Sequence, residues 1–280
     1  MAPYRRGRCQ CLLEKPQNQN NIVMNGGGAV LEPCANDSLE GSAFCESHQN
    51  KCEFKSPMSG YEPKYDSKLW NSKKERRETH NCFAYAMNII DIKQIIDCLT
   101  SPNCNGGFHQ PGAASGREGF KTTNPKTCPD MLTRILGDNP TIQRTTFLEQ
   151  CPARTSKIAL VVDEDEDYHF LRQDSDGWWS QKGGAKPVVK VDASDRPIWN
   201  PELADHNWTN NNGVLNYDIF CGYMCVPRKS KLKISVGGRY TNGRYTNGRR
   251  QTKKKRAAPR APQAKRYHRS QTKHYRGRKA

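Results

Sequence analysis

The sequence predicts an α+β domain whose sheet is mainly antiparallel. Apolar residues recur near helical spacing from Cys82 to Leu99, and this pattern indicates a buried helix. Short apolar and aromatic runs separated by turn signals follow it, and these runs indicate strands. A chain that places its helix first and its strands afterwards is typical of the α+β class.

Two helices are expected in this domain. Asn81 precedes the first helix as an N-cap residue, and Pro102 lies just beyond its end at Leu99. The second, shorter helix is expected from Pro129 to Leu136, where Gly137 ends it.

The strands are expected downstream of the helices. The apolar run Ile158–Val162 predicts a buried strand. Tyr168–Gln173 and Trp178–Lys182 flank a turn sequence that contains Asp and Gly, which predicts a β-hairpin. Further short strands are expected at Val188–Val191 and Ile219–Val226.

The length of the hairpin loop decides which side chains share a face of the sheet. A three-residue loop, Ser175–Gly177, with its glycine in the left-handed conformation, pairs Leu171 with Gln181. His169 and Gln181 then lie on the same face, because side chains alternate along a strand. A loop of two or four residues places Gln181 opposite Phe170 instead, on the other face.

Composition divides the 280 residues into four zones. Residues 1–55 are rich in Cys and His, residues 56–78 resemble an exposed charged connector, and residues 79–227 form the folded domain. The tail, residues 228–280, holds 20 of the chain's 45 Lys and Arg and no Asp or Glu, so the preceding residues carry 25 basic and 28 acidic groups. The tail has few apolar residues and is expected to be disordered when free.

Hydropathy and the N-terminal residues indicate an intracellular protein. The mean hydropathy is −0.93, and no stretch approaches the roughly 18 apolar residues of a membrane span. The first basic residues are not followed by the apolar run of a signal peptide, so secretion by that route is not expected. In a reducing compartment the twelve cysteines are better explained as metal ligands or nucleophiles than as disulfides.

Cys82 is the candidate nucleophile. A cysteine in the first turn of a helix lies where free amide groups favour the thiolate and can hold an oxyanion. His169, on a predicted strand after an acidic run, is the candidate base, and the Gln181 amide can orient its ring. The alternatives are that Cys82 packs in the core and that His169 is structural.

Four segments of the chain carry a resemblance to a known family: Asn81–Ala86, Gln110–Gly112, Asp167–Asp174 with Gly177–Lys182, and Phe220–Val226. They resemble an uncharacterised family of large DNA viruses and scattered eukaryotes and bacteria, some of whose members are labelled insoluble matrix shell proteins. That family in turn resembles papain-like cysteine peptidases and amidases of the NlpC type. The resemblance covers roughly residues 79–226.

The resemblance implies a papain-like domain, with a central helix packed on the sheet, and a catalytic set. By position, Cys82 corresponds to the nucleophile, His169 to the base and Gln181 to the orienting residue, with Asn81 beside the oxyanion. The family has a His followed by Pro-Gly where this chain has Gln181 followed by Lys-Gly-Gly, which weakens the third role. The resemblance also implies the host cytoplasm, the viral factory and the virion as locations, and other virion proteins as partners.

The N-terminal zone contains a candidate zinc site. Cys34, Cys45 and His48 have the spacing C-x10-C-x2-H, and Cys9 or Cys11 can supply a fourth ligand. Soft thiolates and one imidazole in a small polar segment suit a structural, tetrahedral Zn²⁺. We take Cys9, Cys34, Cys45 and His48 as the expected set, which leaves Cys11 and Cys52 surplus. Ordinary buried thiols are expected at Cys98, Cys104, Cys128, Cys151, Cys221 and Cys225.

The basic tail is expected to bind nucleic acid or another polyanion. Its uncompensated charge attracts phosphates, and its interspersed tyrosines permit stacking on bases. A solubilising or localising tail is the alternative, and acidic protein surfaces or anionic lipids attract the same charge. The expected contact residues are Arg249, Arg250, Lys253, Lys254, Lys255 and Arg256.

Two functions are compatible with these features. The first is a cysteine peptidase or amidase that works by acyl transfer through a Cys82 thioester. The second is a non-catalytic structural or packaging protein, in which the same domain is a scaffold while the zinc module and the tail make the contacts.

Overall fold

The computed structural model describes residues 7–15, 31–49, 51–100, 107–120, 125–211, 215–241 and 244–246. The predicted polyanion-binding residues, from Arg249 to Arg256, and Cys104 lie outside these described residues. No helix in the described part of the chain is both long and apolar enough to cross a membrane.

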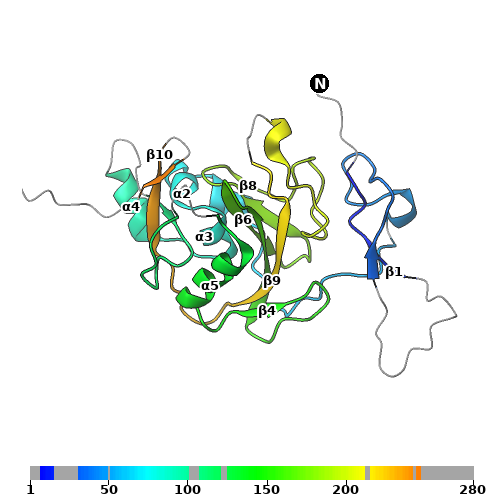
Figure 1. Cartoon of the computed structure of the whole chain (residues 1–280), viewed down its shortest axis with the longest axis horizontal. Helices are drawn as coiled ribbons and strands as arrows, with labels where there is room; N and C mark the ends of the chain where they lie inside the picture. Colours follow the sequence, from blue (N-terminus) through cyan, green and yellow to red (C-terminus); the bar gives the residue numbers. More distant parts are fainter. Residues whose placement is uncertain are drawn as a thin grey trace, which may run out of the picture. The chain divides into compact units, whose positions relative to one another are not determined.

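A six-stranded antiparallel sheet forms the centre of the fold (Figure 1). Its strand order is β4-β9-β5-β6-β7-β8, and every neighbouring pair is antiparallel. The α+β class with an antiparallel sheet is therefore confirmed. The strands are β4 (Gln143–Thr145), β5 (Thr155–Asp163), β6 (Asp167–Gln173), β7 (Trp179–Lys182), β8 (Val188–Val189) and β9 (Ile219–Pro227).

Short helices and small sheets surround this centre. The helices are α1 (Ser67–Asn71), α2 (Lys74–Thr79), α3 (Cys82–Ala86), α4 (Ile92–Leu99), α5 (Cys128–Asp138) and the 3-10 turns η1 (Glu46–His48) and η2 (Trp208–Asn211). The smaller sheets are formed by β1 (Leu12–Glu14) with β2 (Leu31–Pro33), and by β3 (Phe108–His109), β10 (Val236–Thr241) and β11 (Arg244–Thr246).

The sheet separates two apolar cores. On one face, α3 and α5 pack against residues such as Leu160 and Phe170. On the other face, Val161, Leu171 and Trp179 pack with aromatic residues of the later loops. Figure 1 shows the two helices on one side of the sheet and the N-terminal β1 region on the other. The alternation of side chains along β5 and β6 thus assigns each residue to one core or the other.

The β6–β7 hairpin has the predicted three-residue loop. Gly177 has a φ of 86°, and the Asp174 amide donates to the Trp178 carbonyl across 2.9 Å. Leu171 pairs with Gln181 in the resulting register. This prediction is confirmed.

The single helix expected from Cys82 to Leu99 is divided into α3 and α4. The chain leaves the helical conformation at Asn88, which has a φ of 56°. Asp91 then caps α4 by accepting a hydrogen bond from the Gln94 amide at 3.1 Å. Asn81 caps α3 as predicted, since its side chain accepts from the Ala84 amide at 3.2 Å.

The second predicted helix lies within α5 and is confirmed. Thr127 caps it by accepting from the Asp130 amide, and the helix runs through Gly137 to Asp138. The predicted buried strand and the last predicted strand are confirmed as parts of β5 and β9.

The predicted connector and the predicted start of the tail are both folded. Residues 56–78 contain α1 and most of α2, and Trp70 of α1 is 1% exposed with its ring edge against Tyr85. At the other boundary, Arg228 donates to Ser156 Oγ at 2.7 Å and to the Ala86 carbonyl at 3.0 Å. The chain then continues to β10, which pairs with β3. The runs of charged residues led us to place both domain boundaries wrongly. In each segment one side chain, Trp70 or Arg228, anchors the charged stretch to the fold.

Three disulfides correct the expectation of reduced thiols. They join Cys11 to Cys52, Cys128 to Cys221 and Cys151 to Cys225, with Cα–Cα distances of 5.5, 5.2 and 5.5 Å. These distances are typical of disulfides. Cys98 is also disulfide-bonded. Spacing did not reveal the pairs because their partners are 41 to 93 positions apart in the chain.

A bulge in β9 positions two of these bridges. The register with β5 shifts between Leu160 and Val161, opposite Gly222, which has a φ of 111°. Cys221 consequently packs in the core between the sheet and helices α3 and α5. Met224 and Val226 pack in this core too, so Cys225, which lies between them on the strand, points away from it. The two β9 cysteines therefore point to opposite faces of the sheet.

We predict that Gly177→Ala destabilises the protein by about 1 kcal/mol, because a Cβ is disfavoured at a positive φ. The Cβ would also approach Lys55 Cε at 2.8 Å. Gly183→Ala is the matched control, since no positive φ is found there and its Cβ would meet only Lys186 Cδ at 3.7 Å. Urea denaturation of both variants measures the difference, and equal stabilities would contradict the loop assignment.

Candidate functional site

Four side chains of the N-terminal module form a compact ligand cluster. The module comprises residues 7–15, 31–49 and 51–54. The ligand atoms of Cys9, Cys34, Cys45 and His48 all lie within 4.8 Å of one another. Cys45 Sγ lies 3.1 Å from His48 Nδ1 and 3.9 Å from Cys34 Sγ. The structure thus brings together the four residues predicted from the sequence, and this group can hold a metal ion.

Local structure explains how this cluster forms. The β1–β2 pairing continues into hydrogen bonds from the Cys34 amide to the Cys11 carbonyl and from the Cys9 amide to the Asn36 carbonyl, both 2.9 Å. These bonds bring Cys9 beside Cys34. Cys45 is the N-cap of the 3-10 turn η1 and His48 is its last residue, and residues three apart in such a turn lie on the same side.

One sulfur–sulfur distance in the cluster matches an edge of a tetrahedral zinc site. With metal–sulfur bonds of about 2.3 Å, a tetrahedron has sulfur–sulfur edges of about 3.8 Å, close to the observed 3.9 Å.

Burial raises the pKa of the Cys9 thiol to about 12. Burial acts in the same direction on Cys45, but hydrogen bonds from Cys9 and Asn36 outweigh it and lower the pKa of that thiol.

The two surplus cysteines close the same module. Cys11 and Cys52 form a disulfide beside the ligand cluster, and both contact its small apolar core. The cluster therefore excludes Cys11, which sequence reasoning left as an alternative fourth ligand. Cys9 and Cys11 both precede β1 and have separate roles, since Cys9 belongs to the ligand cluster and Cys11 forms the disulfide.

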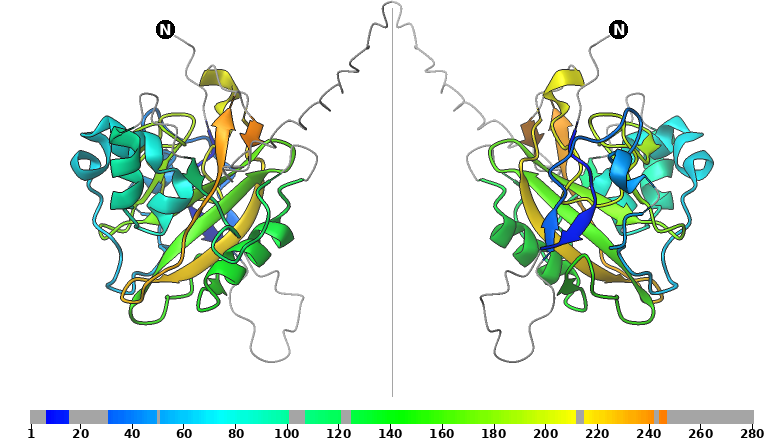
Figure 2. Two further views of the ribbon diagram at one scale, coloured as in Figure 1. Left: turned by 90° about the vertical axis from the view of Figure 1, so that its left-hand side faces the viewer. Right: turned by 90° about the vertical axis from the view of Figure 1, so that its right-hand side faces the viewer.

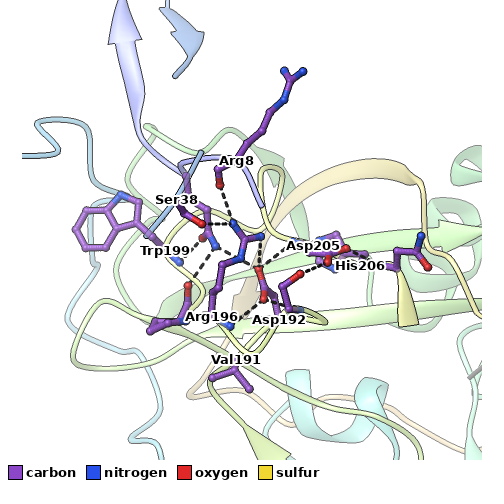
Figure 3. Close-up of polar contacts among 12 residues, drawn as sticks. Arg8, Ser38, Val191, Asp192, Arg196, Trp199, Asp205 and His206 are labelled. Atoms are coloured by element: carbon purple, nitrogen blue, oxygen red, sulfur yellow. Dashed lines mark hydrogen bonds and ion pairs between the residues drawn. The ribbon is translucent and has the colours of Figure 1, made fainter. Parts of the chain in front are cut away.

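A buried arginine docks the module onto the central domain (Figure 3). Arg196 is 1% exposed and donates to the Arg8 carbonyl at 2.8 Å, to Ser38 Oγ at 3.0 Å and to Asp192 Oδ2 at 2.8 Å. Two of these acceptors belong to the module. A Cβ on Gly7 would lie 2.2 Å from Arg196 Cζ, so the backbone approaches this guanidinium closely.

Gln10 supports the same junction from between two cysteines. Its side-chain oxygen accepts from the Trp199 amide at 2.7 Å and the Asn200 amide at 3.1 Å, and its nitrogen donates to the Pro197 carbonyl at 3.2 Å. Sequence reasoning missed Gln10 and Arg196. The partners that they contact across the junction are more than 150 positions away, so no local pattern marks these contacts.

Cys82 is buried in the core between α3 and the sheet. It is 5% exposed, and its Sγ lies 3.9 Å from the Tyr168 carbonyl. Burial raises the pKa of the Cys82 thiol to about 12, so the thiol is protonated at neutral pH. Asn81 beside it is occupied in folding, because it caps α3 and donates to the His109 carbonyl at 2.9 Å.

His169 and Gln181 meet as predicted, on the other face of the sheet. His169 Nε2 lies 2.7 Å from Gln181 Oε1, and Gln181 Nε2 donates to the Val191 carbonyl at 2.5 Å. Because Oε1 must accept, Nε2 of His169 carries the proton. The His169 ring lies against Tyr217, and burial lowers its pKa to about 3.

The structure does not bring Cys82 and His169 together. The residues before and after His169, Tyr168 and Phe170, pack in the core that contains Cys82. His169 alternates with them and therefore points away from that core. The sulfur and the imidazole lie on opposite sides of strand β6.

One comparison with known proteins finds a relative. Insoluble matrix shell protein 1 of Ruditapes philippinarum is 30% identical over 170 residues, which cover 60% of this chain and 93% of the relative. The chain belongs to the family of this protein. No family model and no solved structure matches it. Membership in the matrix shell protein family confirms the part of the sequence resemblance that named such proteins.

Buried neutral histidines predict a loss of stability in acid. The pKa of His169 is depressed from 6.5 to about 3 by burial, so the unfolded chain binds a proton that the folded chain rejects. The stability contributed by neutral His169 is therefore fully present above its unfolded pKa of 6.5 and is lost as the pH falls toward 3. His80 behaves likewise, since burial lowers its pKa to about 4.

We predict that His169→Gln reduces the slope of the unfolding free energy against pH. The reduction is at most about 1.4 kcal/mol per pH unit, which corresponds to the uptake of one proton on unfolding. Urea denaturation of the wild type and the variant at several pH values between 6.5 and 4 measures the two slopes. Because His48 is present in both proteins, any metal-linked contribution cancels. Identical slopes would show that His169 does not stay neutral.

Proposed function

We propose that this chain is a non-catalytic structural protein of an extracellular matrix, built from a zinc-bound module locked onto a disulfide-stapled α+β domain. The observation that carries the proposal is the separation of Cys82 from His169 by the sheet. Acyl transfer needs a thiolate and a base within hydrogen-bonding reach. Here both groups are buried, one as a protonated thiol and one as a neutral imidazole.

Covalent cross-links support the extracellular setting. Disulfides persist in oxidising environments and are rare in the cytosol. The three bridges with both partners described tie the module, α5 and the segment after β4 into the fold. The name of the relative from Ruditapes philippinarum, which places that protein in the matrix of a shell, points the same way. The viral setting expected from the sequence stays a prediction.

Zinc is the proposed occupant of the ligand cluster. Three thiolates and one imidazole form a closed set of four, which is typical of structural Zn²⁺ and leaves no position for a substrate. The bound ion would link Cys9 to Cys34, which follows β2, and to Cys45 and His48 at the η1 turn. Gln10 and Arg8, the neighbours of Cys9, contact the central domain, so the ion would also stabilise the docked module.

The basic tail is proposed to bind polyanions in that matrix. Its charge is uncompensated along residues 228–280, and acidic macromolecules attract such a segment whatever their sequence. Nucleic acid remains the alternative polyanion.

We predict that Cys82 resists electrophiles in the native protein. Treatment with iodoacetamide followed by peptide mass spectrometry should show no rapid modification of the four free cysteines in the described part of the chain. A chelator should expose Cys9, Cys34 and Cys45 to labelling while Cys82 stays unmodified, because only the first three depend on the metal. Rapid labelling of Cys82 that His169→Ala suppresses would support acyl transfer instead.

We predict that the full chain binds one zinc ion and that Cys45→Ser abolishes binding, because the site then lacks a ligand close to His48. Elemental analysis of the purified protein gives the metal content. Cys82→Ser is the matched control and should retain the ion. A wild-type protein without zinc after refolding in excess zinc would overturn the assignment.

We predict that removing residues 249–280 abolishes a salt-dependent retention of the protein on heparin, because 14 basic groups are lost with them. The structure places this cut outside the central fold, since residues up to 248 form one compact unit. Unchanged retention after truncation would assign the binding to the folded part.

A further inference from the structure

Two segments of the chain have the acceptor pattern for N-linked glycans, Asn-x-Ser/Thr. They are Asn36-Asp-Ser38 and Asn207-Trp-Thr209. The pattern matters only for a chain that passes through an oxidising secretory compartment, so the inference rests on the proposed extracellular function. The structure distinguishes the two segments sharply.

The amide of Asn36 is engaged in the N-terminal module. Its Nδ2 donates to Cys45 Sγ at 3.8 Å, so it belongs to the surroundings of the ligand cluster. Ser38, which completes the pattern, is 4% exposed and accepts from Arg196. A sugar on Asn36 would remove the amide from the cluster and disturb the docked module.

The amide of Asn207 is free to carry a sugar. Its Oδ1 accepts from the Thr209 amide at 3.1 Å and from the Thr209 hydroxyl at 2.5 Å, whereas its Nδ2 donates to no described residue. Asn207 is half-buried and Thr209 is exposed. Asn207 directly precedes η2, which protrudes from the fold in both views (Figure 2).

We propose that Asn207 is an N-glycosylation site and that Asn36 is unmodified in the folded protein. In the transfer, Nδ2 of Asn207 forms a bond to the anomeric carbon of an oligosaccharide carried on a lipid diphosphate. The bond from that carbon to the diphosphate oxygen breaks, and the lipid diphosphate leaves with its electron pair. The amide nitrogen loses one proton, so no oxidant or reductant is needed.

The test is expression of the full chain behind a secretion leader in insect cells. Peptide mass spectrometry, before and after enzymatic removal of N-glycans, should find a glycan on Asn207 and none on Asn36. Thr209→Val should abolish the modification, whereas Thr209→Ser should keep it because the hydroxyl is retained. Both variants alter an exposed side chain, so both should fold.

Disulfide mapping of the same secreted protein separates the two proposals. A protein that forms the Cys128–Cys221 bridge but carries no glycan on Asn207, while a glycoprotein reporter from the same cells is modified, overturns this inference alone. A glycan on Asn36 in folded, disulfide-bonded protein also overturns it. A chain that stays reduced inside the cells overturns the extracellular function and this inference together.

Discussion

The alternation of side chains along β6 governs what this domain can do. Tyr168 and Phe170 face the helices, whereas His169 and Leu171 face the loops and the N-terminal module. Alternate residues of β6 therefore pack on opposite faces of the sheet. The sheet keeps apart Cys82 and His169, two groups whose chemistry would require contact, and both side chains are buried.

The N-terminal module shows how few residues are needed to attach a small polar segment to a larger domain. Cys9, Gln10 and Cys11 are consecutive, yet they contribute a member of the candidate ligand cluster, a hub of hydrogen bonds to the domain and a disulfide. Arg196 adds a cation whose donors are shared between the module and Asp192. A segment with little apolar core of its own is thus held by directional interactions.

The sequence was informative wherever a short-range rule determined the structure. Gly177 predicted the loop and hence the contact of His169 with Gln181, and the C-x10-C-x2-H spacing of Cys34, Cys45 and His48 predicted three of the four members of the ligand cluster. It was uninformative where the outcome depended on how separate elements meet. The face of β6 that receives Cys82 depends on the docking of α3, and the disulfide partners depend on the bulge in β9.

The bulge in β9 has a mechanical consequence. Because Cys221 and Cys225 point in opposite directions, one central strand is covalently tied to α5 on one side and to the segment after β4 on the other. The layers above and below the sheet cannot slide past each other without breaking a sulfur–sulfur bond. A force applied to either layer is carried into the same strand, so the domain resists shear as one body.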